Sequence, residues 1–278
     1  MEFKYFSKDG EILPTEKAVV PLSSIEYQYG FGVYESVRVA GSTPRFLDDH
    51  LARLQESARA IGLEHSFSNS SIYGIVRELI EKNAVETCNL KILLIGGKSA
   101  AEASLYILCL NPLFPDKALY RDGVPCITYP YERLFPHAKT LNMLGSYLAY
   151  RASQRAGAYD ALLVNRAGHI TEGTRTNFFC MREKTIASSP EKAILPGVMR
   201  KKILEIAAKN GYVLEEKSIV LSDVVTYDGA FLTSTSSKIL PIRSIDDTAL
   251  RIPPAMCELM RLFDAFLKNE TSRGKAAS

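Results

Sequence analysis

The sequence predicts an α+β protein built from two lobes. At 278 residues the chain is longer than one compact core usually requires, and it suits two packed lobes. Hydrophobic residues make up 46% of the chain and charged residues 23%, which is an ordinary globular composition rather than that of a disordered chain. A segment with two prolines and little periodicity separates the halves. We therefore predict a small N-terminal domain over 1–112, a linker over 113–120 and a larger domain over 121–278.

The N-terminal half shows the alternation of a strand followed by the periodicity of helices. Apolar residues alternate near 33–39, and the turn residues Gly-Ser-Thr-Pro follow at 41–44. Apolar residues then recur at steps of three and four over 47–61, with two aspartates at the start, where the helix dipole favours acid. We expect a second helix and two more strands to complete the small domain, over 72–82, 90–95 and 105–110.

The C-terminal half alternates strand-like and helix-like patterns, which suits a larger α+β domain. Strands are expected at 124–129, 161–164, 177–181, 212–217 and 230–233. Helices are expected over 144–156, 198–209 and 253–268. The polar tail after Asn269 is expected to be mobile.

Composition disfavours several classes of protein. The formal charge is only +3, with no long run of one sign, so a nucleic-acid partner is not expected. The five cysteines are far apart and never in a CxxC spacing, which indicates reduced thiols in a cytoplasmic protein without a metal site. The start has no apolar stretch, and no run approaches 18 apolar residues, so we expect neither a signal peptide nor a membrane span.

Two polar segments of the C-terminal half suit an anion. Pro196 and Gly197 directly precede a helical pattern, where the free backbone N–H groups of a helix start attract negative charge. The hydroxyl-rich run over 233–237 follows a strand and suits phosphate or carboxylate oxygens. Each has a plainer interpretation: a simple turn into a helix for the first, and a polar loop for the second.

Three charged residues are candidates for chemistry. Glu172 lies between two predicted strands, where a carboxylate is costly to bury unless it meets a cation or a ring N–H. Lys139 lies between an irregular segment and an amphipathic helix, and Arg53 faces away from the apolar stripe of its helix. Taken singly, they are equally a solvated hairpin glutamate, a surface lysine and an exposed arginine.

Taken together and in order, these segments resemble the class IV, or fold type IV, pyridoxal-phosphate enzymes. That family contains branched-chain aminotransferases, D-amino acid aminotransferases and aminodeoxychorismate lyases. The matching tracts are YQYGFGVYE at 27–35, HLARL at 50–54, KTLN at 139–142, ITEGTRTN at 170–177, LPGVMR at 195–200 and TSTSSKILPI at 233–242. The resemblance implies the two-domain fold of this class, with a small α/β N-terminal lobe and a larger C-terminal lobe that contains a pseudo-barrel of strands.

The resemblance also implies a role for each charged residue toward pyridoxal 5'-phosphate. Lys139 would bind the cofactor aldehyde as a Schiff base and later move the proton of the substrate Cα. Glu172 would pair with the pyridine nitrogen and keep it protonated, so that the ring accepts electrons. Arg53 would grip the phosphate, because a guanidinium fork can bind two oxygens at once.

The remaining implied contacts come from the loops of the larger domain. Val198 and Met199 would offer backbone N–H groups to the phosphate, and Thr235 a hydroxyl. Leu195 would lie against the cofactor ring, for which plain packing is the alternative. Asn177 is expected to support the hairpin that carries Glu172.

The match departs from each subfamily at the substrate side. Branched-chain aminotransferases carry a tyrosine where this chain has Leu144, which favours the D-aminotransferase and lyase branch. The D-enzymes, however, carry an arginine and a histidine two apart after the small-lobe strand, and this chain has Gly-Gly-Lys-Ser at 96–99. Lys91 matches the arginine of branched-chain enzymes at this strand, but it lacks a bidentate fork. The residues expected to contact substrate are Tyr29, Tyr34, Lys91 and Ser236, and half-buried strand aromatics are the alternative for the two tyrosines.

These features predict a transaminase that uses a branched-chain or other aliphatic L-amino acid and 2-oxoglutarate. An aminodeoxychorismate lyase that releases pyruvate and a D-amino acid aminotransferase are the alternatives. A binding protein without turnover is a third possibility, which the presence of Lys139, Glu172 and Arg53 disfavours. The resemblance also implies a homodimer that acts on small amino and keto acids.

Overall fold

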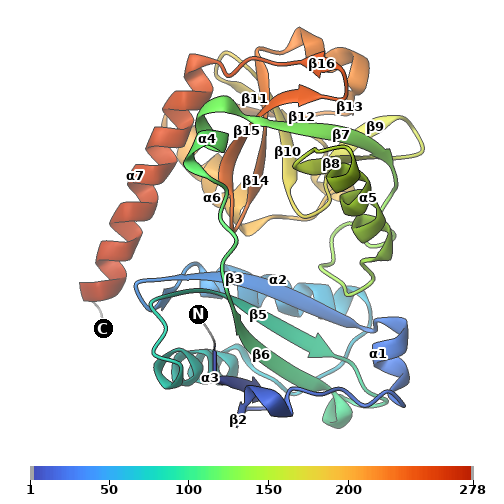
Figure 1. The fold of residues 1–278 in the computed structure, drawn as a ribbon, viewed down its shortest axis with the longest axis vertical. Helices are drawn as coiled ribbons and strands as arrows, with labels where there is room; N and C mark the ends of the chain where they lie inside the picture. Colours follow the sequence, from blue (N-terminus) through green and yellow to red (C-terminus); the bar gives the residue numbers. More distant parts are fainter. Residues whose placement is uncertain (1–2, 277–278) are drawn as a thin grey trace. The chain divides into compact units, whose positions relative to one another are not determined.

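The structure is a computed structural model that describes the backbone of residues 3–276 and the side chains of residues 3–270 (Figure 1). The chain divides into two compact units. Unit 1 holds the chain up to Leu113, the segment His137–Asn142 and the residues from Thr271. Unit 2 holds Phe114–Pro136 and Met143–Glu270. The chain therefore returns to unit 1 for six residues after it has entered unit 2.

Unit 1 is built on a six-stranded antiparallel sheet in the order β2-β1-β6-β5-β3-β4. Buried and half-buried residues alternate along β5, which is why its sequence shows a strand pattern. The strands are β1 (Tyr5–Lys8), β2 (Glu11–Pro14), β3 (Gly32–Ala40), β4 (Thr43–Pro44), β5 (Thr87–Ile95) and β6 (Ser104–Leu110).

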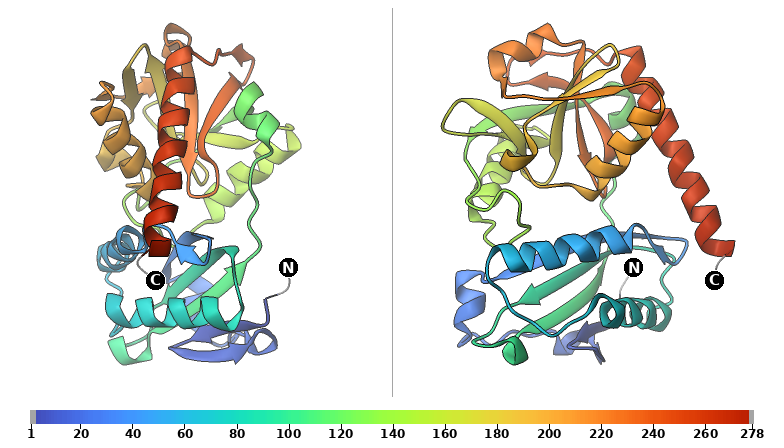
Figure 2. Two further views of the ribbon diagram at one scale, coloured as in Figure 1. Left: turned by 90° about the vertical axis from the view of Figure 1, so that its left-hand side faces the viewer. Right: turned by 180° about the vertical axis from the view of Figure 1, so that it is seen from behind.

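Two long helices supply the apolar stripe that covers this sheet (Figure 2). Leu51 of the first and Leu79 of the second join one core with Val37, Leu90 and Ile107 of the strands. These helices are α2 (Leu47–Ala60) and α3 (Asn69–Lys82), and the short elements of unit 1 are α1 (Ile25–Tyr29), η1 (Thr15–Lys17) and η2 (Ala100–Glu102).

Unit 2 contains a closed barrel of six strands in the order β10-β14-β15-β7-β8-β9. The ring closes because β9 pairs back onto β10 through Glu172 and Asn177. Strands β8 and β10 are buried almost throughout, which explains why their sequences read as continuous apolar runs. The six are β7 (Val124–Pro130), β8 (Asp160–Val164), β9 (His169–Gly173), β10 (Asn177–Arg182), β14 (Gly229–Ser234) and β15 (Lys238–Ile245).

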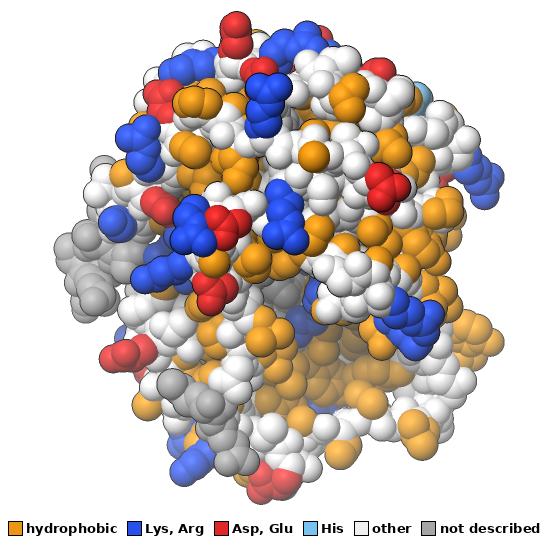
Figure 3. Space-filling model, turned by 45° about the horizontal axis from the view of Figure 1, so that its top comes forward, with side chains coloured by type: hydrophobic (Ala, Val, Ile, Leu, Met, Phe, Trp, Pro, Cys, Tyr) orange, Lys and Arg blue, Asp and Glu red, His pale blue; other side chains and the backbone are white. Residues whose placement is uncertain are grey.

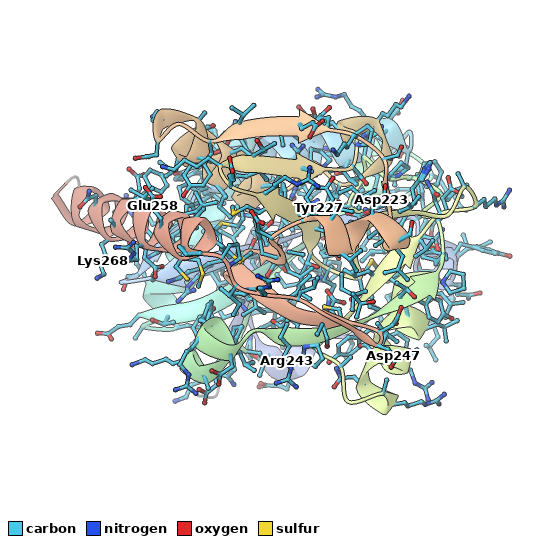
Figure 4. The ribbon with its side chains drawn as sticks, turned by 90° about the horizontal axis from the view of Figure 1, so that it is seen from above. Asp223, Tyr227, Arg243, Asp247, Glu258 and Lys268 are labelled. Carbon is cyan, nitrogen blue, oxygen red and sulfur yellow. The ribbon has the colours of Figure 1, made fainter. Side chains whose placement is uncertain are left out.

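Short strands and helices surround the barrel. Near its start, α7 is fixed by Glu258, which accepts hydrogen bonds from Lys184 and Tyr212 at 3.2 Å each (Figure 4). The strands are β11 (Thr185–Ser188), β12 (Val213–Glu216), β13 (Ile219–Val220) and β16 (Thr248–Ala249). The helices are α4 (Lys117–Asp122), α5 (Leu144–Arg155), α6 (Val198–Lys209), α7 (Pro254–Ala276), η3 (Glu191–Ala193) and η4 (Leu221–Thr226).

Two sequence-based expectations about irregular segments are wrong. The range 113–120, expected to be a linker, contains the first residues of α4, because Asp116 caps this helix by accepting a hydrogen bond from the Ala118 N–H at 2.8 Å. The tail after Asn269, expected to be mobile, continues α7 to Ala276. Its lysine, arginine and glutamate residues are good helix formers, so the end of apolar periodicity does not end the helix.

The surface and the longest helices show two further properties. Basic and acidic side chains are interspersed over the face drawn in Figure 3. Within the described part of the chain, no helix combines the length and the apolar character needed to cross a membrane.

Candidate active site

Lys139 lies in unit 1, on a segment that pairs with β3. Its carbonyl accepts a hydrogen bond from the Tyr34 N–H at 2.9 Å, and Leu141 N–H donates to the Gly32 carbonyl at 2.8 Å. The Lys139 N–H donates to Ser57 Oγ of α2 at 3.0 Å. Sequence analysis places Lys139 inside the range 121–278, whereas these bonds join it to the N-terminal sheet. Both main-chain groups of the lysine are therefore held, which restricts where its side chain can point.

Tyr34 brings Lys139 together with Lys91. Lys139 Nζ lies 4.5 Å from the centroid of the Tyr34 ring, and Lys91 Nζ lies 3.3 Å from it. Both distances are in the range of cation–π contacts. The Tyr34 side chain belongs to a residue only 6% exposed. Three residues that sequence analysis selected thus lie side by side. Tyr29, by contrast, is 78% exposed on α1.

Arg53 is a buried residue, not the exposed arginine that its helix position alone indicates. It is 7% exposed and donates from Nε and Nη2 to the two carboxylate oxygens of Glu35, at 2.7 and 2.8 Å. His50, one turn earlier in α2, lies 2.7 Å from Glu35 through Nδ1. Burial raises the pKa of Glu35, but the charges and hydrogen bonds of Arg53 and His50 outweigh burial and hold this pKa well below its usual range.

Sequence analysis did not assign Glu35 and His50 to the site. A signal for them was present, since a glutamate interrupts an otherwise apolar strand and His50 precedes Arg53 by three residues on one helix face. Such a pattern shows that two polar residues share a face. It does not show that Glu35 of β3 meets them.

Glu172 lies at the closure of the barrel in unit 2. It is 4% exposed, so the interpretation as a solvated hairpin glutamate is wrong. One oxygen accepts from Arg133 Nη1 at 2.8 Å, and the other accepts from the Leu195 N–H at 3.1 Å. Arg133 also donates to the carbonyls of Phe135 and Pro136, at 3.3 and 3.2 Å. Sequence analysis missed Arg133, because it lies in an irregular segment whose pattern carries no signal.

Asn177 and Gly197 shape the approach to helix α6. Asn177 Nδ2 donates to the Leu195 carbonyl at 2.8 Å, so Leu195 is held by Asn177 and Glu172 together. A Cβ atom on Gly197 would collide with Asn177 Oδ1, which explains the glycine at the helix start. The first-turn N–H groups, at Val198 and Met199, have no acceptor within the helix, and no side chain caps it.

The loop between β14 and β15 gathers hydroxyl groups. Ser234 Oγ lies 2.7 Å from Ser237 Oγ and 3.3 Å from Ser236 Oγ, on either side of Thr235. At the end of β14, Thr233 pairs with Asn177 across the sheet, and its buried Oγ1 has no hydrogen-bond partner among the described residues. A buried hydroxyl of this kind is costly unless a ligand or water meets it.

The donors and acceptors of the two units fit pyridoxal 5'-phosphate. Its aldehyde requires an amine, its ring nitrogen a carboxylate, and its phosphate N–H and O–H donors. The chain provides an amine at Lys139, a buried carboxylate at Glu172, and donors at the start of α6, at Thr233 and in the hydroxyl loop. In contrast, no group of three or more His, Cys, Asp or Glu side chains within the described residues could hold a metal ion.

Comparisons with known proteins agree with this chemistry. The family described as "Amino-transferase class IV" matches residues 32–245. A D-alanine aminotransferase of Bacillus licheniformis is 32% identical over 249 residues, which cover 86% of this chain and 87% of the relative. A solved branched-chain aminotransferase of Thermoproteus uzoniensis with norvaline is 26% identical, with a TM-score of 0.85 over 94% of this chain and 93% of that one. A solved branched-chain aminotransferase with pyridoxamine 5'-phosphate, from the source abbreviated T.th., has a TM-score of 0.88 at 23% identity, over 98% and 96%.

The fold and these groups define an enzyme that transfers amino groups with the help of pyridoxal 5'-phosphate. The family match spans most of the chain, so this chain belongs to the class IV aminotransferases. The predicted class IV fold, including the pseudo-barrel, is thereby confirmed, as is the predicted cofactor.

Proposed function

We propose that this aminotransferase moves an amino group between a branched-chain or other aliphatic L-amino acid and 2-oxoglutarate, with Lys139 as its catalytic residue. The observation that carries the proposal is the position of Lys139, whose main chain is fixed on β3 beside Tyr34 and Lys91. When bound, pyridoxal phosphate supplies an electron sink for the electrons of the substrate Cα–H bond. Lys139 Nζ holds the cofactor covalently and then carries the proton from Cα.

Glu172 is proposed to hold the proton on the cofactor's ring nitrogen. A carboxylate can do this only while it is ionised, and Arg133 stabilises that form through a buried ion pair. The Leu195 N–H fixes the second oxygen and so orients the carboxylate plane. The Leu195 side chain is proposed to lie against the ring.

Arg53, the N–H groups of Val198 and Met199, and the Thr235 hydroxyl are proposed to bind the cofactor phosphate. Glu35 takes two of the five N–H donors of the Arg53 guanidinium and fixes its plane. The start of α6 adds the positive end of a helix dipole. An orienting role of this kind requires no motion of the arginine during the reaction.

Lys91, Tyr34, Tyr29 and Ser236 are proposed to contact the substrate. A lysine supplies a point charge for a carboxylate, which suits both an amino acid and 2-oxoglutarate. The solved branched-chain aminotransferase at 26% identity supports an aliphatic substrate. We propose further that the enzyme is a homodimer of the cytoplasm, for which the unpaired state of all five cysteines is consistent support.

D-Alanine is the second candidate substrate. The 32% identical relative from Bacillus licheniformis carries that name, and Leu144 occupies the place of the tyrosine of branched-chain enzymes. One assay separates the candidates: the purified enzyme is given 2-oxoglutarate with L-leucine, L-valine, L-alanine or D-alanine, and the configuration of the glutamate formed is determined. L-Glutamate from L-leucine supports the first proposal, whereas D-glutamate from D-alanine alone replaces it with the second.

A further inference from the structure

Two lysine side chains of unit 1 share one aromatic ring. Lys91 Nζ lies 3.3 Å and Lys139 Nζ 4.5 Å from the centroid of Tyr34. The two nitrogens are therefore at most about 8 Å apart, a distance at which unit charges in a partly buried setting still interact appreciably. The spacing is set by the sheet, because β3 and β5 pair with Ser36 opposite Lys91 and Tyr34 two residues away on the same face.

The ring does not stabilise the two ammonium groups equally. A cation over an aromatic face is attracted by the ring quadrupole, and the attraction weakens with distance. Lys91 Nζ is closer to the centroid by more than an ångström, so the ring favours the charged form of Lys91 over that of Lys139. The two positive charges meanwhile disfavour each other. Loss of a proton from Lys139 relieves this repulsion at the smaller cost.

The other charged groups on the elements packed around Lys139 do not offset the repulsion. Helix α2 contributes Arg53 and His50, and β3 contributes Glu35. The Glu35 carboxylate is engaged by Arg53 and His50 through three short contacts of 2.7 to 2.8 Å. This group of three therefore has no net negative charge. His137 on the segment of Lys139 itself is exposed and can add only positive charge.

We propose that Lys91 is a positioning residue that keeps the Lys139 amine neutral and so prepares it to attack an aldehyde. The proposal rests on the proposed function, in which Lys139 holds the cofactor. In the reaction, Nζ of the neutral amine bonds to the aldehyde carbon, and the aldehyde oxygen leaves as water with the two amine hydrogens. An ammonium lacks the electron pair for this bond, and a neighbouring cation is an established means of activating a lysine. The role of Lys91 toward Lys139 is separate from any contact with substrate.

The test compares the pH dependence of Lys139 in variants of Lys91. Lys91→Met and Lys91→Gln remove the charge, Lys91→Arg keeps it, and Lys8→Met is the matched control. Lys8 lies on the same sheet over another tyrosine, Tyr106, at 5.8 Å from its centroid. The full chain without added cofactor is treated with acetic anhydride across a pH series, and acetylation of Lys139 is followed by peptide mass spectrometry. The second readout, on the holoenzyme without substrate, is the pH midpoint of the visible absorbance of the bound cofactor.

Removal of the Lys91 charge is expected to move the pH midpoint of Lys139 acetylation upward by about one unit, which slows the reaction about tenfold at neutral pH. The absorbance midpoint moves in the same direction. Lys91→Arg and Lys8→Met keep the midpoints of the parent protein. Unchanged midpoints in both Lys91→Met and Lys91→Gln would overturn the inference.

Failure of the inference is distinguishable from failure of the proposed function. Borohydride reduction of the holoenzyme followed by peptide mapping identifies the lysine that carries the cofactor. Attachment to Lys139 with unmoved midpoints rejects the role of Lys91 alone. Attachment to a different lysine rejects the proposed function and, with it, the inference.

Discussion

Glu172 and Asn177 face each other in the pairing that closes the barrel of unit 2, and both of them hold Leu195. Glu172 accepts from the Leu195 N–H, and Asn177 donates to the Leu195 carbonyl. The loop before α6 is thus anchored at the residue pair that joins the two ends of the sheet. This arrangement gives a carboxylate a fixed orientation at a buried position, which a surface hairpin would not provide.

Glu172→Gln is expected to leave cofactor bound but to slow proton abstraction about a thousandfold, corresponding to roughly 4 kcal/mol. The substitution keeps the size of the side chain and removes the charge that favours a protonated ring nitrogen. Single-turnover spectroscopy with an amino acid substrate measures the rate. Exposed Glu191, in the same unit, gives the control Glu191→Gln, which retains the parent rate. A parent rate in the Glu172 variant would mean that this carboxylate does not face the ring.

Lys139→Ala is expected to abolish both the visible absorbance of the bound cofactor and transamination. Only an amine can hold the cofactor aldehyde covalently, and this lysine lies at the family's position for it. The absorbance spectrum of the purified protein and an assay of glutamate formation provide the two measurements. Lys209→Ala alters an exposed lysine of α6 and serves as the control. Normal turnover by the Lys139 variant contradicts the assignment.

Arg53→Ala is expected to weaken cofactor binding and also to lower the free energy of unfolding by about 3 to 5 kcal/mol. The loss of stability arises because Glu35, which is fully buried, keeps a charge without its main partner. Chemical denaturation and titration of the apo-enzyme with cofactor measure the two effects.

The double variant Glu35→Gln with Arg53→Ala separates these effects. Removal of the buried charge is expected to recover part of the lost stability, because no ionised carboxylate is then left unpaired. Cofactor affinity is expected to remain low, since the guanidinium is still absent. Recovery of affinity in the double variant would show that Arg53 does not bind the phosphate.

Glu35 and Asp160 are expected to give the acid limb of stability opposite slopes. The pKa of Glu35 is held below its usual value, against the effect of burial, by Arg53 and His50, so its contribution is present above the unfolded value and is lost as pH falls through the folded pKa. Burial raises the pKa of Asp160, although hydrogen bonds from Thr174 and Thr176 oppose the shift. Protonation of Asp160 therefore favours the folded state as pH falls.

Denaturation curves of Glu35→Gln and Asp160→Asn across pH 3 to 7 measure these two slopes. Relative to the parent, the loss of stability on acidification becomes shallower in Glu35→Gln and steeper in Asp160→Asn. Parallel curves for all three proteins would show that neither carboxyl has a shifted pKa.

The sequence determined the elements whose signals are local. Helix α6 begins and ends at the predicted residues, 198 and 209, because its apolar periodicity, its Pro-Gly start and its lysine end all lie within the helix itself. The class of enzyme was also readable, since the tracts around Lys139, Glu172 and 195–200 keep their order and residue types along the chain. Each of these signals needs no knowledge of which segments meet.

Only the tertiary structure decided which of these residues meet. Arg53 reads as exposed until Glu35 of β3 is found opposite it, and Arg133 has no signal until it is found at Glu172. Lys139 lies far along the chain from β3, yet its backbone completes hydrogen bonds with that strand. Pairs of this kind depend on strand register and on the direction in which each side chain leaves its element, and neither is written in the periodicity of one segment. The sequence therefore identified the reactive groups, and the sheet of unit 1 and the barrel of unit 2 determined their partners.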